Sequence, residues 1–152
     1  MGLDNGVRVV FHLNKIEDSL RLPTNIFRLA ESVYVETSEN EPSYIIKCDM
    51  IYWRRWWGVR NEVLRHLGLG DNPYRMDLTM ENIKDMIKVL KYFRNQEHWN
   101  NEGMSDWFYK EHHIEEQIDV DIYVLESLIK IMDTYFDMIE NGLMDVYFYD
   151  SY

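Results

Sequence analysis

The residue types best suited to metal chemistry lie together in EHHIEE, at positions 111–116. If this segment is one helix, His112 and Glu116 share a face, as do His112 and Glu115, and such pairs can hold zinc or iron. A catalytic metal site needs a third protein ligand and a neighbouring residue that orients the ligands. The spacing supplies neither, and no His-Glu-x-x-His motif is present. We therefore expect an exposed polar helix face here and no bound cofactor.

Covalent and phosphate-binding chemistry has even weaker support. Cys48 is the only cysteine, so neither an internal disulfide nor a four-cysteine zinc site can form within one chain. No Gly-x-Ser-x-Gly turn occurs, and GLGDNP, residues 68–73, lacks the lysine and hydroxyl residue of a phosphate-binding loop. The sequence therefore favours a protein that is not an enzyme.

The segment IYWRRWWGVRNEVLRHLG, residues 51–68, concentrates three tryptophans and four arginines. We predict that it forms a helix capped by Asp49. At 100° per residue, Trp53, Trp56 and Trp57 fall in one apolar stripe, while three of the arginines fall on the opposite face. A surface that binds single-stranded nucleic acid needs stacking and basic side chains on the same face. We therefore expect inward-facing tryptophans and no direct nucleic-acid binding.

Arg60 is the exception, because it lies inside the apolar stripe, one turn from Trp56 and Trp57. An arginine in such a position pairs with a carboxylate, stacks on an indole or extends its head to the surface. We favour a structural arginine that is ion-paired or reaches solvent. The alternative is a pocket in which Arg60, Trp56 and Trp57 face a ligand, as a small-ligand or metal-binding enzyme would require.

The net charge of −11 is unevenly distributed. Residues 1–94 carry 13 acidic and 14 basic side chains, whereas residues 95–152 carry 14 acidic and two basic ones, a balance of −12. A field of one sign over a third of a small protein repels nucleic acid and attracts basic surfaces. The alternative explanation is that the acidity only keeps the protein soluble.

A row of carboxylates near and along the last predicted helix is the best candidate binding surface. We call this row the acidic strip: Glu111, Glu115, Glu116, Asp119, Glu126, Asp133 and Asp137. Steps of seven residues place carboxylates about 10.5 Å apart along a helix axis, and we expect Asp145 and Asp150 to extend the field. The expected partner is a host protein with a basic nucleic-acid-binding groove, and binding should weaken steeply with salt.

Hydrophobic periodicity predicts one α+β domain over residues 1–152, a small antiparallel sheet packed with three or four helices. Besides the tryptophan-rich helix, the expected elements include strands at 7–13 and 145–151 and a hairpin at 32–48, and in the first strand Val7, Val9, Phe11 and Leu13 alternate onto one face. Helices are expected at about 80–97, capped by Thr79, from Ser105, which caps it, and at 119–140, with Phe136 in its apolar stripe. A loop should precede Ser105, and the aromatic residues Trp99, Trp107, Phe108 and Tyr109 should anchor this region. No window approaches 18 uncharged apolar residues, so no membrane span is expected.

Three places resemble a family of small phage and prophage proteins of unestablished function. The chain opens with MGLD and an apolar strand, YWRR at residues 52–55 is similar to that family's Tyr-Trp-Arg-Lys helix start, and VYFYDSY at residues 146–152 is similar to its aromatic-rich tail. The sequence departs from the family at Asn5 and Gly6, which replace an apolar-aromatic pair, and at Arg60, where a histidine often occurs. The resemblance implies a viral or mobile-element origin and brings no reaction or catalytic residue.

The leading hypothesis is a non-enzymatic phage accessory protein that binds a host protein through the acidic strip. Its specific form is an anti-defence inhibitor similar to an anti-CRISPR, which mimics nucleic acid in the cytoplasm of an infected bacterium. Two alternatives stay open: an enzyme with a pocket at Arg60, and a self-associating structural or regulatory protein that forms a homodimer.

Overall fold

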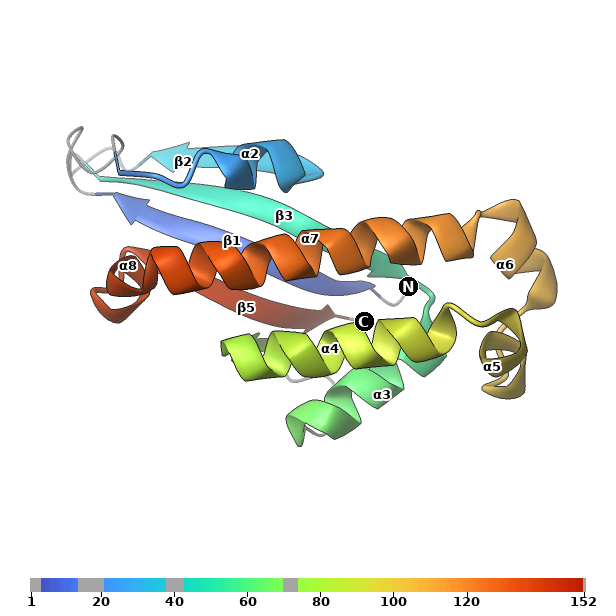
Figure 1. Cartoon of the computed structure of the whole chain (residues 1–152). Helices are drawn as coiled ribbons and strands as arrows, with labels where there is room; N and C mark the ends of the chain where they lie inside the picture. Colours follow the sequence, from blue (N-terminus) through green and yellow to red (C-terminus); the bar gives the residue numbers. More distant parts are fainter. Residues whose placement is uncertain (1–3, 14–20, 38–42, 70–73, 152) are drawn as a thin grey trace.

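A five-stranded antiparallel sheet with helices packed on one face forms the fold (Figure 1). The computed structural model describes residues 4–13, 21–37, 43–69 and 74–151. The strands are β1 (Asp4–Leu13), β2 (Ser32–Thr37), β3 (Tyr44–Arg54), β4 (Tyr74–Asp77) and β5 (Met144–Ser151), in the order β2-β3-β1-β5-β4. The helices are α2 (Asn25–Leu29), α3 (Trp57–Leu67), α4 (Met80–Phe93), α5 (Gln96–Asn101), α6 (Asp106–Glu111), α7 (Ile114–Thr134) and α8 (Phe136–Glu140). The predicted α+β class is confirmed, although short helices in the described ranges raise their number above the expected three or four.

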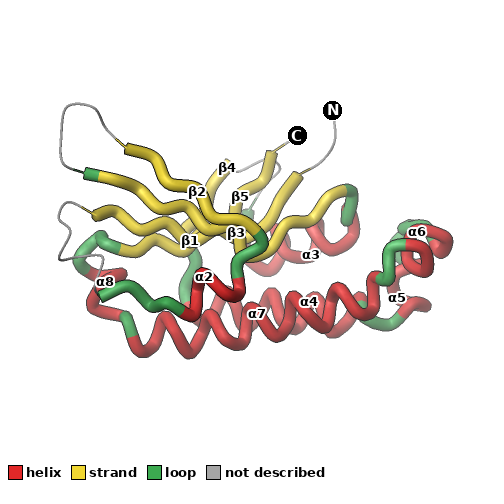
Figure 2. The backbone as a smooth tube through the Cα atoms, turned by 90° about the horizontal axis from the view of Figure 1, so that it is seen from above, coloured by secondary structure: helices red, strands yellow, loops and turns green. Residues whose placement is uncertain are grey.

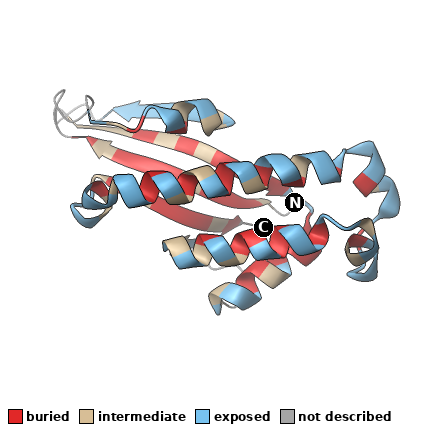
Figure 3. Cartoon of the chain, viewed as in Figure 1, coloured by how far each residue is buried: buried red, intermediate tan, exposed pale blue. Residues whose placement is uncertain are grey.

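The sheet has one helix-covered face and one open face. α4 and α7 lie side by side across the covered face, and within the described ranges no helix lies on the other (Figure 2). The alternation predicted for the first strand is confirmed, because Val7, Val9, Phe11 and Leu13 are fully buried. Buried residues concentrate on the sheet and on the sides of α4 and α7 that face it (Figure 3). The core therefore lies between the sheet and the helical layer.

The tryptophan-rich helix begins later than predicted. Trp53 belongs to β3, which pairs with β1 over Tyr44–Arg54, and α3 starts only at Trp57. β3 is rich in β-branched and aromatic residues, and its pairing with a neighbouring strand outweighs the helical spacing of the apolar side chains. Asp49 therefore caps no helix, and its carboxylate instead accepts a hydrogen bond from Arg8 on β1.

The capping predictions downstream are confirmed. Thr79 and Asn82 form a reciprocal capping box at the start of α4, in which each side chain accepts a hydrogen bond from the other residue's backbone N–H. Ser105 caps α6. The prediction that α4 reaches residue 97 is wrong, because the helix ends at Phe93 and Asn95 caps the separate helix α5, where part of the loop was expected.

The single helix predicted for residues 119–140 is two helices. α7 already begins at Ile114, and the helix breaks at Tyr135 before α8. Phe136 follows this break and is exposed, although the helical spacing placed it in the buried stripe. The predicted final strand is confirmed as β5, which lies between β1 and β4. None of the described helices combines the length and apolar composition needed to cross a membrane.

Candidate functional site

The acidic strip lies exposed on α6 to α8, and five of its seven carboxylates form no ion pair with any residue that the structure describes. The two exceptions are Glu115 and Asp119, which pair with Arg94 at the end of α4, with nitrogen–oxygen distances of 3.1 Å and 2.6 Å. This contact lowers the pKa of Asp119 through a hydrogen bond from Arg94. The unpaired members are Glu111, Glu116, Glu126, Asp133 and Asp137. The strip is therefore strongest along the second half of α7 and on α8.

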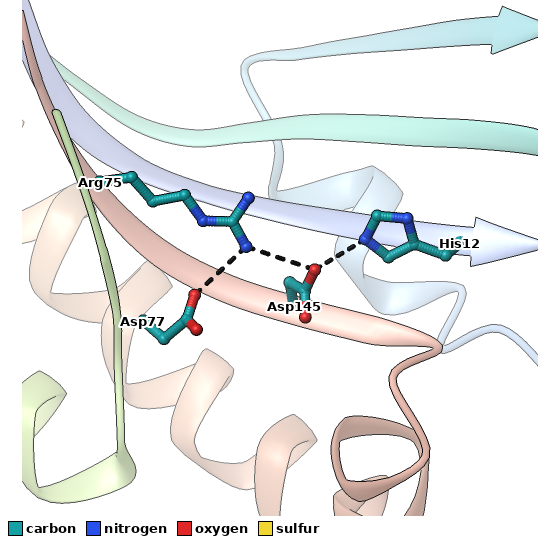
Figure 4. A network of polar contacts seen from close by, with 4 residues as sticks. All are labelled: His12, Arg75, Asp77 and Asp145. Atoms are coloured by element: carbon teal, nitrogen blue, oxygen red, sulfur yellow. Dashed lines mark hydrogen bonds and ion pairs between the residues drawn. The ribbon is translucent and has the colours of Figure 1, made fainter.

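The expected extension of the strip to Asp145 and Asp150 is wrong. Both residues lie on β5, where odd and even positions point to opposite faces of the sheet. Asp150 points into the core and is fully buried. On the open face, Asp145 accepts hydrogen bonds from His12 and Arg75, at 2.7 Å and 3.3 Å, and Arg75 also contacts Asp77 (Figure 4). These carboxylates stabilise the sheet and add nothing to the acidic strip.

Arg60 is a buried, ion-paired residue. Only 2% of it is exposed, and its Nε and Nη2 atoms donate to the two carboxylate oxygens of Asp150 at 3.0 Å and 2.8 Å. This paired contact joins α3 to β5 and leaves the guanidinium enclosed. The structure thus favours the structural role of Arg60 over the ligand pocket with Trp56 and Trp57.

The tryptophans face inward in two cases out of three. Trp53 and Trp56 are buried and stack with ring centroids 5.8 Å apart, and Trp56 meets the edge of buried Trp99 at 5.6 Å. Trp57 is 46% exposed, so its predicted inward orientation is wrong. Trp57 is the first residue of α3 and falls at the edge of its apolar stripe, so it is only partly covered by the rest of the chain.

The metal-binding pair was expected only if residues 111–116 form one helix, and they do not. His112 ends α6, His113 adopts a left-handed conformation with φ 49°, and Glu116 belongs to the next helix, α7. His112 instead packs on Phe108, with ring centroids 4.2 Å apart. Within the described ranges, no three histidine, cysteine, aspartate or glutamate residues lie close enough together to hold a metal ion.

Asp121 is a buried carboxylate that the charge count did not distinguish from the exposed ones. The indole N–H of Trp53 and the side-chain amide of Gln117 donate to its two oxygens, each at 3.0 Å. Burial raises the pKa of Asp121 to about 6, although both hydrogen bonds act to lower it. The sequence did carry a signal, because a helical projection places Asp121 within the apolar stripe of α7 between Ile118 and Leu125.

A cleft of about 600 Å³ lies between the end of β3 and the helices α6 and α7. Arg54, Arg55 and Trp107 line it, and none of these had been assigned to a pocket. The two arginines were expected on the solvent face of a helix. Trp107 was expected to anchor its segment, but it is 66% exposed. This cleft is open to solvent, and of the residues expected in a ligand pocket, Arg60, Trp56 and Trp57, only Trp56 lines it.

No protein-family model, curated protein or solved structure matches this chain. The geometry and chemistry of the acidic strip and the cleft therefore carry the functional argument.

Proposed function

We propose that this protein binds a partner protein through the acidic strip, which occupies a basic nucleic-acid-binding groove of that partner. The observation that carries the proposal is the set of five exposed strip carboxylates without an ion pair in the described structure. A carboxylate that already has a basic neighbour gains less from a new cation than one that faces only water. The unpaired carboxylates are thus the ones with charge available for a partner.

The helix gives these charges fixed spacing. α7 contains 21 residues, which corresponds to about 31 Å along its axis. Glu126 and Asp133 stand two turns apart on it, and Asp137 follows on α8. Lys130 is the only basic residue of the two helices. Such a row presents a negative potential to a basic groove without ordering a flexible tail, which lowers the entropic cost of association.

The finer form of the proposal is an anti-defence inhibitor of phage origin, similar to an anti-CRISPR. It acts in the cytoplasm of an infected bacterium, does not bind nucleic acid directly and catalyses no reaction. Support comes from the resemblance to phage proteins and from the ability of spaced carboxylates to stand in for phosphates.

The test is capture of nucleic-acid-binding proteins from bacterial lysate, with competing DNA and a salt series. The wild-type protein should capture such a partner at low salt and release it when DNA or salt is added. A triple variant with Glu126→Gln, Asp133→Asn and Asp137→Asn should bind the identified partner at least about tenfold more weakly, a loss of about 1.4 kcal/mol.

A control variant carries the same charge change elsewhere. Glu36→Gln, Glu62→Gln and Asp77→Asn replace carboxylates of β2, α3 and β4, whose surface ion pairs contribute little to stability. This control should bind as the wild type does. Equal loss of affinity in both triple variants, or capture that added DNA does not reverse, would contradict the proposal that the acidic strip is the binding surface. Inhibition of purified RNA-guided nucleases in a DNA-cleavage assay then tests the finer form.

A second candidate function, self-association, is favoured by the exposed edge strand β2. Val33, Tyr34 and Val35 are all exposed, and no described strand pairs with the outer edge of β2. If two copies pair antiparallel with Tyr34 opposite Tyr34, each Val33 meets a Val35 and each Ser32 meets a Glu36. This register places apolar residues together and no like charges opposite each other. A homodimer through β2 is therefore physically compatible with the sequence of the strand.

Light scattering during size-exclusion chromatography tests the homodimer. The wild-type mass should approach twice that of the chain, and Val35→Lys should restore the monomer. Val120→Lys, which changes another exposed valine, on α7, should leave the dimer intact. A monomeric wild type at about 100 μM would exclude a dimer of ordinary affinity.

A further inference from the structure

The cleft beside the end of β3 combines basic side chains with exposed aromatic rings. Its volume of about 600 Å³ lies within the usual range of small-molecule sites. One wall comes from the end of β3 and the turn after it, with Tyr52, Arg54 and Arg55. The other wall comes from α6 and the start of α7, with Trp107 and His112.

The two arginines have charge available for a ligand. Neither Arg54 nor Arg55 forms an ion pair with any described residue. By contrast, Arg8, Arg60 and Arg94 each contact a carboxylate. A guanidinium binds phosphate through parallel hydrogen bonds, and two neighbouring guanidinium groups strengthen the local positive potential. The cleft therefore favours an anionic group.

The aromatic residues supply a stacking surface. Trp107 is 66% exposed, although an indole buries a large apolar area in most positions. Its ring meets the edge of His112 with centroids 6.1 Å apart, and His112 packs in turn on Phe108. Trp107 thus has a neighbour that orients it and a face left open to solvent. An exposed, oriented indole can stack on a planar ring of a ligand.

One wall of the cleft contains a residue with an unfavourable backbone conformation, and a second such residue lies between two lining residues of the other wall. Arg55, with φ 64°, and His113, with φ 49°, are the two non-glycine residues with positive φ in the described chain. Arg55 turns the chain from β3 into α3, and His113 turns it from α6 into α7. Such conformations cluster at binding and catalytic sites, where the surrounding structure enforces them. Arg55 lines the cleft, and His113 lies between the lining residues His112 and Ile114. This placement is an observation separate from the charge and the aromatic rings.

We propose that this cleft binds a nucleoside monophosphate, with the phosphate on Arg54 and Arg55 and the base stacked on Trp107. Two further lining residues fit the rest of such a ligand, since Gln117 provides an amide and Glu31 a carboxylate for sugar hydroxyls or an amino group. The Glu31 carboxylate also repels a free phosphate, so the ring and sugar are needed for affinity. This proposal is independent of the acidic strip.

Isothermal titration calorimetry with AMP, GMP, CMP and UMP tests the site in the full-length protein. At least one nucleotide should bind with saturation, and adenosine or inorganic phosphate alone should bind at least about tenfold more weakly. Arg54→Gln should weaken binding about tenfold or more, because each charge-assisted hydrogen bond contributes about that factor. Arg55→Asn, which tolerates the left-handed conformation, and Trp107→Ala should each do the same.

Matched controls separate the cleft from general surface effects. Arg65→Gln changes an exposed arginine of α3, and Tyr123→Ala changes an exposed aromatic residue of α7, both outside the cleft. Both variants should bind the nucleotide as the wild type does. The proposal is overturned if none of the four nucleotides saturates the protein by about 10 mM, a range weaker than most specific sites. Equal affinity for inorganic phosphate, or equal loss in the controls, also overturns it.

Discussion

Replacing Asp121 with asparagine should make the protein more stable at neutral pH. The raised pKa means that the unfolded chain loses this proton at lower pH than the folded chain does, so ionisation of Asp121 favours unfolding as the pH rises. The shift from 3.8 to about 6 corresponds to about 3 kcal/mol of unfolding free energy above pH 6, at about 1.36 kcal/mol per pKa unit. The asparagine oxygen can still accept from Trp53, and the amide of Gln117 can turn to present its carbonyl.

Urea denaturation followed by circular dichroism at pH 5 and pH 7.5 measures this effect. The quantity compared is the unfolding free energy of Asp121→Asn minus that of the wild type. Groups that titrate equally in both proteins contribute nothing to this difference. This difference should increase by about 1.4 kcal/mol from pH 5 to pH 7.5. The increase is smaller than about 3 kcal/mol because part of the destabilisation by Asp121 is already present at pH 5. Asp119→Asn is the control, since Arg94 lowers the pKa of Asp119 below its usual value of 3.8 and the stability from this contact is fully present at both pH values. The difference in unfolding free energy between this variant and the wild type should therefore not change between pH 5 and pH 7.5. A difference for Asp121→Asn that does not change with pH would refute a desolvated carboxylate at this position.

Three further substitutions test how the fold is held, and chemical denaturation measures each. Arg60→Met leaves Asp150 buried without its arginine and should lower the unfolding free energy by about 3–5 kcal/mol; adding Asp150→Asn should restore part of this loss, and no restoration would contradict the pairing. Gly6→Ala places a methyl group 1.9 Å from the carbonyl oxygen of Ile51, so it should disrupt β1–β3 pairing, and unchanged stability would contradict that close contact. Thr79→Ala removes the capping box of α4 and should cost about 1 kcal/mol, which an unchanged urea midpoint would disprove.

Local patterns predicted those elements whose boundaries are set by neighbouring residues. The alternation of β1 and the capping positions Thr79 and Ser105 all involve residues within a few positions of one another, so the sequence displays them directly. The start of α3, by contrast, is not set by neighbouring residues. Trp53 joins a strand because β1, about 45 residues earlier, pairs with it in register with Asn5. A helical projection contains no information on such a partner.

The same limit applies to Asn5 and Gly6 at the start of β1. Gly6 lies where any side chain would meet the backbone of β3 at Ile51, so the position requires glycine. Asn5 is fully buried, and its side-chain amide has no hydrogen-bond partner among the residues that the structure describes. A buried amide without a partner is costly, and nothing in the structure explains its presence. Its neighbours across the strands are Trp53 and Asp150, so the end of β1 belongs to a buried polar region that only the tertiary structure reveals.

The charge count located the acidic third of the chain but not the part of it that faces a partner. Its boundary fell directly after Arg94 and separated this arginine from Glu115 and Asp119, its partners in the folded protein. Once Arg94 is counted with them, the first half of α7 has less free charge than its carboxylates suggest. The second half has no such cation apart from Lys130. A basic partner should therefore contact Glu126 and the residues after it more closely than the start of α7, and this is why the triple substitution is placed there.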